Sequence, residues 1–189
     1  MAATNPAVSS PSNPKAASAP VSYAKLWIIA VVVLVLDQAT KLWIVNSVPA
    51  GANPYDGGMI EVVPNFFYII HVYNDGAAWS IFSGYSTILG LLGFVALGAI
   101  YFFRKQLELH RSLLQLIFGL LIGGIIGNMI DRFAYGHVVD FLDFHLGSYR
   151  YPAFNVADSG ITVGVGIYIV LSLIEAFKEK KAAPAPEKS

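Results

Sequence analysis

The sequence contains no cysteine, and this absence excludes several kinds of chemistry at once. There can be no disulfide, no thiolate metal ligand and no cysteine nucleophile. Charge is scarce too, because charged residues make up 13% of the chain, whereas soluble domains carry about 25%. The formal net charge is zero and no basic face carries interleaved aromatic residues, so nothing in the sequence indicates nucleic-acid binding.

Apolar residues dominate instead. Hydrophobic residues make up 56% of the 189 positions, and the mean hydropathy is +0.60. Crossing a bilayer takes about 20 mostly apolar residues, and four segments are long enough. These segments lie at about 25–45, 86–103, 113–130 and 156–177. We therefore expect a mainly α membrane protein, with one four-span domain over residues 23–181.

The two ends of the chain have a different character. Residues 1–22 are rich in Ala, Ser, Pro and Asn, which predicts a disordered tail. This stretch is not a signal peptide, because the apolar run after it leads into Asp37 and Lys41 rather than into a small-residue cleavage site. Residues 182–189 are expected to form a second flexible tail.

Basic residues predict the orientation. Between the spans they gather in the short connection before residue 113, and they also flank the first and fourth spans, whereas residues 46–85 contain no Lys or Arg. The positive-inside rule then puts both termini in the cytoplasm, and both longer loops outside. The first outward loop has a turn cluster at 53–58, and a Val-, Ile-, Phe- and Tyr-rich stretch at 61–73 that predicts a small periplasmic sheet over the site. An interfacial hairpin with only a packing role is the alternative.

Polar residues at membrane depth are the candidate functional residues. Asp37 and Lys41 are spaced i, i+4, so they share a helix face and can pair. Such a pair can order the outward end of the first span near an active site. The alternative is an ion pair that only lowers the cost of insertion, with Lys41 reaching outward to the interface.

Two further pairs follow. Asn74 offers a donor and an acceptor for a peptide, and Gly76 permits a tight turn, although an ordinary Asn-Asp-Gly turn explains both. Asn128 and Arg132 again share one face, and the guanidinium suits carbonyls, a lipid headgroup, or a carboxylate such as Asp131. An arginine that only reaches toward the interface is the alternative.

Two aspartates stand out before the last span. Asp140 lies in the His- and Asp-rich stretch at 137–145, where a metal site is an alternative. If this stretch is extended, Asp140 and Asp143 face opposite sides, one inward and one toward solvent. Asp158 opens the last span three residues after Asn155, a spacing that a helix cap alone would explain.

Converging carboxylates can split an amide with water. We expect Asp140 and Asp158 to hold one water molecule between them. One carboxyl group is ionised and takes a proton from the water, and the other is protonated and supports the carbonyl oxygen. Like charges in a poorly solvated site disfavour double ionisation, so the pair titrates as a unit. No metal or other cofactor is needed for this chemistry.

Five blocks in order resemble the bacterial signal peptidase II family of intramembrane aspartic proteases, which process prolipoproteins. The blocks are Leu36-Asp-Gln-Ala-Thr-Lys41, Tyr73-Asn-Asp-Gly-Ala-Ala-Trp-Ser80, Gly124-Ile-Ile-Gly-Asn-Met-Ile-Asp-Arg132, Val138-Val-Asp-Phe141 and Phe154-Asn-Val-Ala-Asp-Ser159. The resemblance covers about residues 23–181.

The resemblance implies that Asp140 and Asp158 are the catalytic pair. It implies supporting or substrate-binding roles for Asp37, Lys41, Asn74, Gly76, Asn128, Arg132, Asn155 and Ala157. The implied substrate is a diacylglyceryl-modified prolipoprotein in the inner membrane, cleaved just before its lipidated cysteine, and globomycin-type cyclic peptides are implied inhibitors. The rival interpretation is a proton- or ion-coupled transporter that uses Asp37, Asp140 and Asp158, although internal repeats are not evident.

Overall fold

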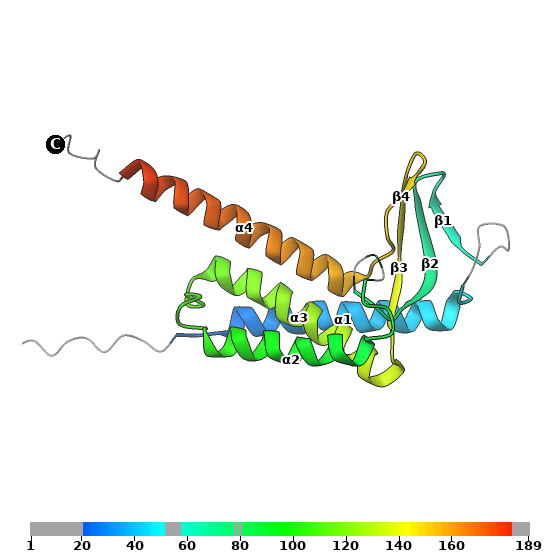
Figure 1. Cartoon of the computed structure of the whole chain (residues 1–189), viewed down its shortest axis with the longest axis horizontal. Helices are drawn as coiled ribbons and strands as arrows, with labels where there is room; N and C mark the ends of the chain where they lie inside the picture. The colour runs from blue at the N-terminus through cyan, green and yellow to red at the C-terminus, as the bar shows by residue number, and fades with distance from the viewer. Residues whose placement is uncertain (1–20, 52–57, 78, 80, 183–189) are drawn as a thin grey trace, which may run out of the picture.

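The computed structural model describes residues 21–51, 58–77, 79 and 81–182. The predicted tails lie almost wholly outside this range, as does most of the turn cluster at 53–58. Four helices and a four-stranded sheet make up the described part (Figure 1). The helices are α1 (Ala24–Ser47), α2 (Ser86–Phe102), α3 (Ser112–Tyr135) and α4 (Val156–Ala182).

Three helices are long and apolar enough to cross a membrane: α1, α3, and α4 up to Lys178. The fourth predicted span corresponds to α2, an apolar helix of only 17 residues. At 1.5 Å per residue it extends about 25 Å, slightly less than the ~30 Å hydrocarbon core. Large apolar side chains are exposed along α1, α2 and α4, as expected for helices that face lipid.

Helix α3 lies at the centre of the bundle, between α1, α2 and α4 (Figure 1). Small residues allow this close packing. A Cβ atom on Gly123 would come within 2.6 Å of the Ala30 carbonyl oxygen of α1. Gly124, the next residue of α3, faces α4, and a Cβ there would collide with the Ala157 carbonyl. The helices therefore approach one another at backbone distance, as small residues permit in membrane bundles.

The sheet stands at one end of the bundle, beside the start of α4 (Figure 1). Its strands are β1 (Ile60–Val63), β2 (Phe67–Asn74), β3 (Val138–Leu146) and β4 (Tyr149–Arg150), antiparallel and in that order. The predicted strand-forming stretch at 61–73 is thus confirmed as a hairpin, but it is only half of the sheet. Strand β3, from the second long loop, pairs with β2 and brings Asp140 opposite Val72.

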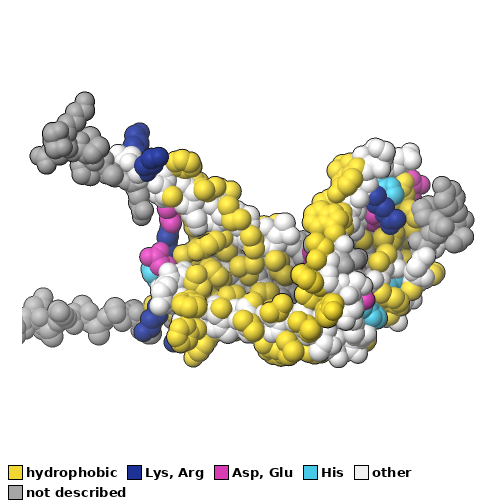
Figure 2. Space-filling model, viewed as in Figure 1, with side chains coloured by type: hydrophobic (Ala, Val, Ile, Leu, Met, Phe, Trp, Pro, Cys, Tyr) yellow, Lys and Arg dark blue, Asp and Glu magenta, His cyan; other side chains and the backbone are white. Residues whose placement is uncertain are grey.

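The two ends of the molecule differ in charge. Helix α1 begins, α4 ends and α2 connects to α3 at the end opposite the sheet (Figure 1). Lys and Arg side chains gather at that end, and a smaller basic group lies beside the sheet (Figure 2). Apolar side chains cover most of the surface between them, which is the distribution of a membrane protein.

One prediction about the sheet was wrong. Asp143 was expected to face solvent if Asp140 faced inward, but both are buried. The reason is that Arg150 and His145 cover the second face of β3 and contact the Asp143 carboxylate at 2.9 and 3.0 Å. Tyr68 of β2 is also buried, and its hydroxyl accepts a hydrogen bond from the Asn65 backbone N–H.

Candidate active site

Asp140 and Asp158 meet at one cavity of about 730 Å³. Asp140 comes from β3, and Asp158 comes from the first turn of α4. Both side chains line this cavity, together with apolar side chains from α2, α3 and α4. The two carboxylates predicted to converge therefore do so, although 17 residues separate them in the sequence.

Asn155 links the two aspartates. Its side-chain Nδ2 donates to Asp140 Oδ1 at 2.8 Å, while its Oδ1 accepts the backbone N–H of Asp158 at 2.9 Å. The backbone N–H of Asn155 in turn donates to Asp158 Oδ2 at 3.2 Å. The predicted capping arrangement is therefore present, and the cap itself holds both carboxylates. Helix capping and a site role do not exclude each other here.

Donor-only groups fix the orientation of the three amides that contact the pair. The Lys41 ammonium donates to Asn128 Oδ1 at 2.9 Å, so the Asn128 Nδ2 is left to donate to Asp158 Oδ1 at 2.7 Å. The Gly76 N–H donates to Asn74 Oδ1 at 3.0 Å, which leaves the Asn74 Nδ2 for Asp140 Oδ2 at 2.9 Å.

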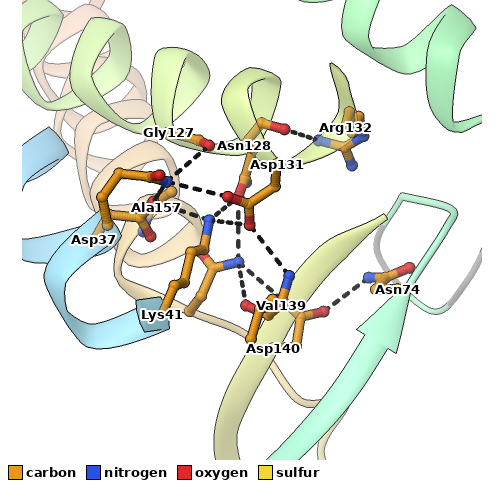
Figure 3. Close-up of polar contacts among 12 residues, drawn as sticks. Asp37, Lys41, Asn74, Gly127, Asn128, Asp131, Arg132, Val139, Asp140 and Ala157 are labelled. Carbon is orange, nitrogen blue, oxygen red and sulfur yellow. Dashed lines mark hydrogen bonds and ion pairs between the residues drawn. The ribbon is translucent and has the colours of Figure 1, made fainter. Parts of the chain in front are cut away.

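The orientation of the Asn155 amide is fixed in the same way. Its Oδ1 accepts the backbone N–H of Asp158, so its Nδ2 is left to donate to Asp140. Every hydrogen bond between these three amides and the carboxylate oxygens of the two aspartates is therefore donated by an amide nitrogen. Figure 3 shows two of the contributing side chains, with Asn74 directed at Asp140 and Lys41 at Asn128.

Lys41 is buried with only 3% of its surface exposed, which rules out the interpretation that it reaches outward to the interface. Its ammonium contacts Asp37 Oδ2 at 2.8 Å and Asp131 Oδ2 at 2.9 Å. Together with Asn128, these groups use all three of its protons. The predicted i, i+4 pair with Asp37 is confirmed, within a larger cluster.

Asp37 ties three helices together. Its Oδ1 accepts the backbone N–H of Ala157 at 2.9 Å, at the start of α4. Gly127 of α3 lies against the same carboxylate, and a Cβ there would collide with Asp37 Oδ2. Ala157 is fully buried and packs close to Gly127. The first turn of α4, which carries Asp158, is therefore held directly on α1 and α3.

Arg132 holds the loop that contains Asn74. One guanidinium nitrogen donates to the Gly76 carbonyl oxygen at 2.9 Å, and another donates to the Asn128 carbonyl at 3.3 Å. Arg132 also lines the 730 Å³ cavity. It does not pair with Asp131, which was one of the predicted partners; Asp131 instead accepts Lys41, Gln38 at 3.1 Å and a backbone N–H of β3.

Sequence reasoning did not assign site roles to Asp131 and Gln38. Asp131 is 1% exposed, and the Gln38 side chain bridges it to Asp37. A signal for Asp131 existed, because it lies three residues after Asn128 on the same face of α3. Gln38 had no comparable pattern, since its role depends on how α1 docks against α3.

Burial, and secondly the nearby charge of Asp158, raise the pKa of Asp140 to about 7. The hydrogen bonds from Asn74 and Asn155 oppose this shift but do not cancel it. Asp140 therefore titrates close to neutral pH. Such a carboxyl group can carry a proton at pH 7 and still give it up, which general acid–base chemistry requires.

Among the described residues, no group of three or more His, Cys, Asp or Glu side chains converges to hold a metal ion. The His- and Asp-rich stretch at 137–145 divides between the two faces of β3. Asp143 and His145 contact each other, whereas Asp140 faces the cavity.

Comparisons with known proteins agree with this site. A family model described as signal peptidase (SPase) II matches residues 29–174. The chain is 37% identical over 153 residues to a lipoprotein signal peptidase of Desulforapulum autotrophicum, covering 77% of this chain and 89% of that one. It is 39% identical to lipoprotein signal peptidases of Staphylococcus carnosus, covering 80% and 92%, and of Staphylococcus aureus, covering 82% and 90%.

Solved structures are similar as well. One, described as a bacterial membrane enzyme at 2.3 Å resolution, superposes with a TM-score of 0.73 at 36% identity, over 85% of this chain and 93% of the other. A second, at 1.9 Å, gives 0.67 at 37% identity, over 78% and 91%. The family model, these relatives and the shared fold agree, and the chain belongs to the signal peptidase II family of membrane peptidases.

Proposed function

We propose that this protein is an aspartic endopeptidase that removes the signal peptide from diacylglyceryl-modified prolipoproteins, cleaving just before the lipidated cysteine. The observation that carries the proposal is the pair of carboxylates, Asp140 and Asp158, lining one cavity that the apolar helices also line. Family membership supports prolipoprotein cleavage, and the pairing of the two acids supports the aspartic mechanism.

In the proposed mechanism the two carboxyl groups share one proton and bind one water between them. The ionised carboxylate takes a proton as the water oxygen attacks the scissile carbonyl carbon. The protonated partner gives its proton to the carbonyl oxygen, forming a neutral tetrahedral diol. When the C–N bond breaks, a proton passes to the leaving nitrogen. The products are a signal peptide with a free carboxyl group and a lipoprotein whose cysteine carries a free amino group.

The supporting residues have stated tasks in this mechanism. Asn74, Asn128 and Asn155 orient the two carboxylates by donating hydrogen bonds to them. Lys41 and Asp37 hold α1, α3 and the start of α4 in register. Arg132 fixes the loop at Gly76 over the cavity. Preorganised groups of this kind lower the reorganisation needed in the transition state.

We infer that the site lies near the periplasmic face of the inner membrane, with both termini cytoplasmic. The cluster of Lys and Arg at the end opposite the sheet supports this orientation (Figure 2). Helix α2 acts as the fourth crossing, because it packs along α3 and exposes large apolar side chains such as Phe94 and Val95. Its short length is accommodated by local thinning of the bilayer.

The orientation can be tested by labelling, since the chain has no native cysteine. Val62→Cys on β1 and Lys105→Cys at the opposite end are both exposed positions. In intact cells a membrane-impermeant maleimide should label the first and not the second. Labelling of the second alone would invert the proposed topology.

The large cavity suits an amphiphilic substrate. Its apolar side chains include Leu89 of α2, Met129 of α3 and Ile161 of α4, so acyl chains and the signal segment can reach the dyad from the lipid. Globomycin-type cyclic peptides are expected to occupy the same cavity and to compete with substrate.

The function is tested with a synthetic diacylglyceryl prolipoprotein peptide and the purified protein in detergent. Mass spectrometry should find cleavage before the modified cysteine, and in H₂¹⁸O one heavy oxygen should enter the signal-peptide carboxyl group. The rival transporter function predicts ion flux in liposomes with the peptide left intact. Loss of cleavage on exhaustive chelation, restored by a divalent cation, would contradict the metal-free mechanism.

A further inference from the structure

A second, smaller cavity of about 310 Å³ also reaches Asp140. It shares six of its nine lining residues with the large cavity, and beyond them it extends toward β2 and β4 rather than toward the helices. The shared residues are Asn74, Trp79, Asp140, Tyr151, Pro152 and Ala153. The two cavities differ in their lining. Aliphatic side chains of α2, α3 and α4 line only the large one, whereas Arg150 and Tyr73 line only the small one. The two cavities therefore adjoin at Asp140, and the small one adds the Arg150 cation on the side away from the helices.

Arg150 is held in place at the small cavity. Its Nε donates to Asp143 Oδ1 at 2.9 Å, and Asp143 is 1% exposed. Backbone pairing of Arg150 with His145 fixes the main chain as well. The Arg150 side chain is nevertheless 54% exposed, and its Nε bond is the one hydrogen bond it makes to the described residues. Its two terminal nitrogens remain available to bind an acceptor.

The next step rests on the proposed function. A peptide hydrolysed at Asp140 must extend away from the dyad in two directions. The half before the cysteine is an apolar signal segment, which fits the large cavity. The half after the cysteine begins a hydrophilic mature chain, which cannot enter lipid without losing hydration. The apolar half of the substrate thus fits the large cavity, and the hydrophilic half fits the small cavity that Arg150 lines.

We propose that the smaller cavity binds the first residues of the mature lipoprotein, and that Arg150 favours an acidic side chain directly after the lipidated cysteine. A planar guanidinium already oriented through its Nε is suited to bind a carboxylate with its remaining nitrogens. Arg150 is then a specificity-determining residue, and Asp143 positions it.

The test uses three diacylated peptides that are identical except for Asp, Asn or Lys directly after the modified cysteine. Zwitterionic detergent keeps anionic lipid headgroups away from Arg150. The wild-type protein should cleave the Asp peptide about two- to fivefold more efficiently, in kcat/KM, than the Lys peptide, the range expected for a half-exposed ion pair. The Asn peptide should fall between them.

The matching variants are built on Asp143→Asn, so that no buried carboxylate loses its cation. Adding Arg150→Glu to this background should reverse the order and favour the Lys peptide. Arg104→Gln removes a cation at the opposite end of the molecule and should leave the wild-type order unchanged.

Equal cleavage of the three peptides by the wild-type protein would overturn the role of Arg150 and the small cavity while leaving the proposed function intact. The wild-type result by itself decides whether the small cavity prefers an acidic side chain, even if a variant fails to fold. Failure to cleave any of the peptides would instead refute the proposed function, and this inference with it.

Discussion

The two faces of strand β3 carry buried aspartates with opposite surroundings. Asp143, on one face, contacts the cation of Arg150 at 2.9 Å and lines neither cavity. Asp140, three residues earlier, receives only neutral amide donors and shares its cavity with a second carboxyl group. Both are about equally buried. Burial alone therefore does not single out a candidate catalytic carboxylate; the informative feature is that Asp140 has no direct ion pair among the described residues.

The same contrast holds for the rest of the site. Asp37 and Asp131 are as deeply buried as Asp140, yet both contact Lys41 within 2.9 Å. Asp158 makes no ion pair with the described residues and accepts hydrogen bonds from neutral donors. The cation-paired carboxylates hold the helices together, and the two without an ion pair among the described residues are the ones we propose for catalysis.

The largest expected effect comes from removing either unpaired carboxylate. Asp140→Asn or Asp158→Asn should lower the rate of prolipoprotein cleavage by about 10²–10⁴-fold, because in the proposed mechanism each carboxyl group transfers a proton. Asp143→Asn is the matched control and should stay within about fivefold of wild type, because Asp143 lines neither cavity and its partner Arg150 is half exposed. A gel-shift assay with the three variants measures this. A similar loss in all three would mean that the two faces of β3 do not differ in function.

A second prediction compares the cations. Lys41→Met leaves Asp37 and Asp131 buried without a cation and should cost about 3–5 kcal/mol of stability. Arg150→Gln leaves Asp143 with His145 and a neutral amide, and should cost less, about 1–3 kcal/mol. Chemical denaturation in detergent measures both. An equal or larger loss for Arg150→Gln would show that Lys41 is not the main cation of the fold.

The pH dependence of stability should also distinguish Asp140 from Asp143, which lie on opposite faces of β3. Because burial raises the pKa of Asp140 from 3.8 to about 7, the folded state binds a proton that the unfolded state releases. The wild-type protein therefore loses stability as the pH rises from about 4 to 7, by about 2–3 kcal/mol between pH 5 and pH 8. Asp140→Asn should lack this loss, and Asp143→Asn should keep it. Melting temperatures at the two pH values test this.

The smallest effect concerns one amide. The Asn74 donor lowers the pKa of Asp140, so Asn74→Ala should raise that pKa further. The alkaline limb of the activity profile should then move to higher pH by less than about one unit, with a modest loss of rate. A shift to lower pH would contradict the assigned direction of this hydrogen bond.

Much of this arrangement could be predicted from local patterns. Apolar runs indicated the helices, and a β-branched and aromatic stretch indicated β2. The i, i+4 spacing of Asp37 and Lys41 and the i, i+3 spacing of Asn155 and Asp158 indicated a real ion pair and a real cap. These contacts lie within one turn of helix, where backbone geometry decides which side chains meet.

Contacts between distant segments could not be predicted in the same way. The pairing of β2 with β3 brings Asn74 to Asp140 across 66 residues, and its register depends on the whole sheet. The burial of Asp143 depends on where β4 places Arg150. The roles of Gln38 and Asp131 depend on how α1 and α3 approach each other. Each needs the tertiary fold, which local periodicity does not determine.

The central claim is that a carboxyl group without a cation keeps a proton near neutral pH. Infrared difference spectroscopy of the wild-type protein against Asp140→Asn, titrated from acid to alkaline pH, measures this most directly. The account predicts a carboxylic acid band at pH 6 that is present in the wild type, missing in the variant, and lost with a midpoint near the Asp140 pKa of about 7. A fully ionised Asp140 at pH 6 would contradict it.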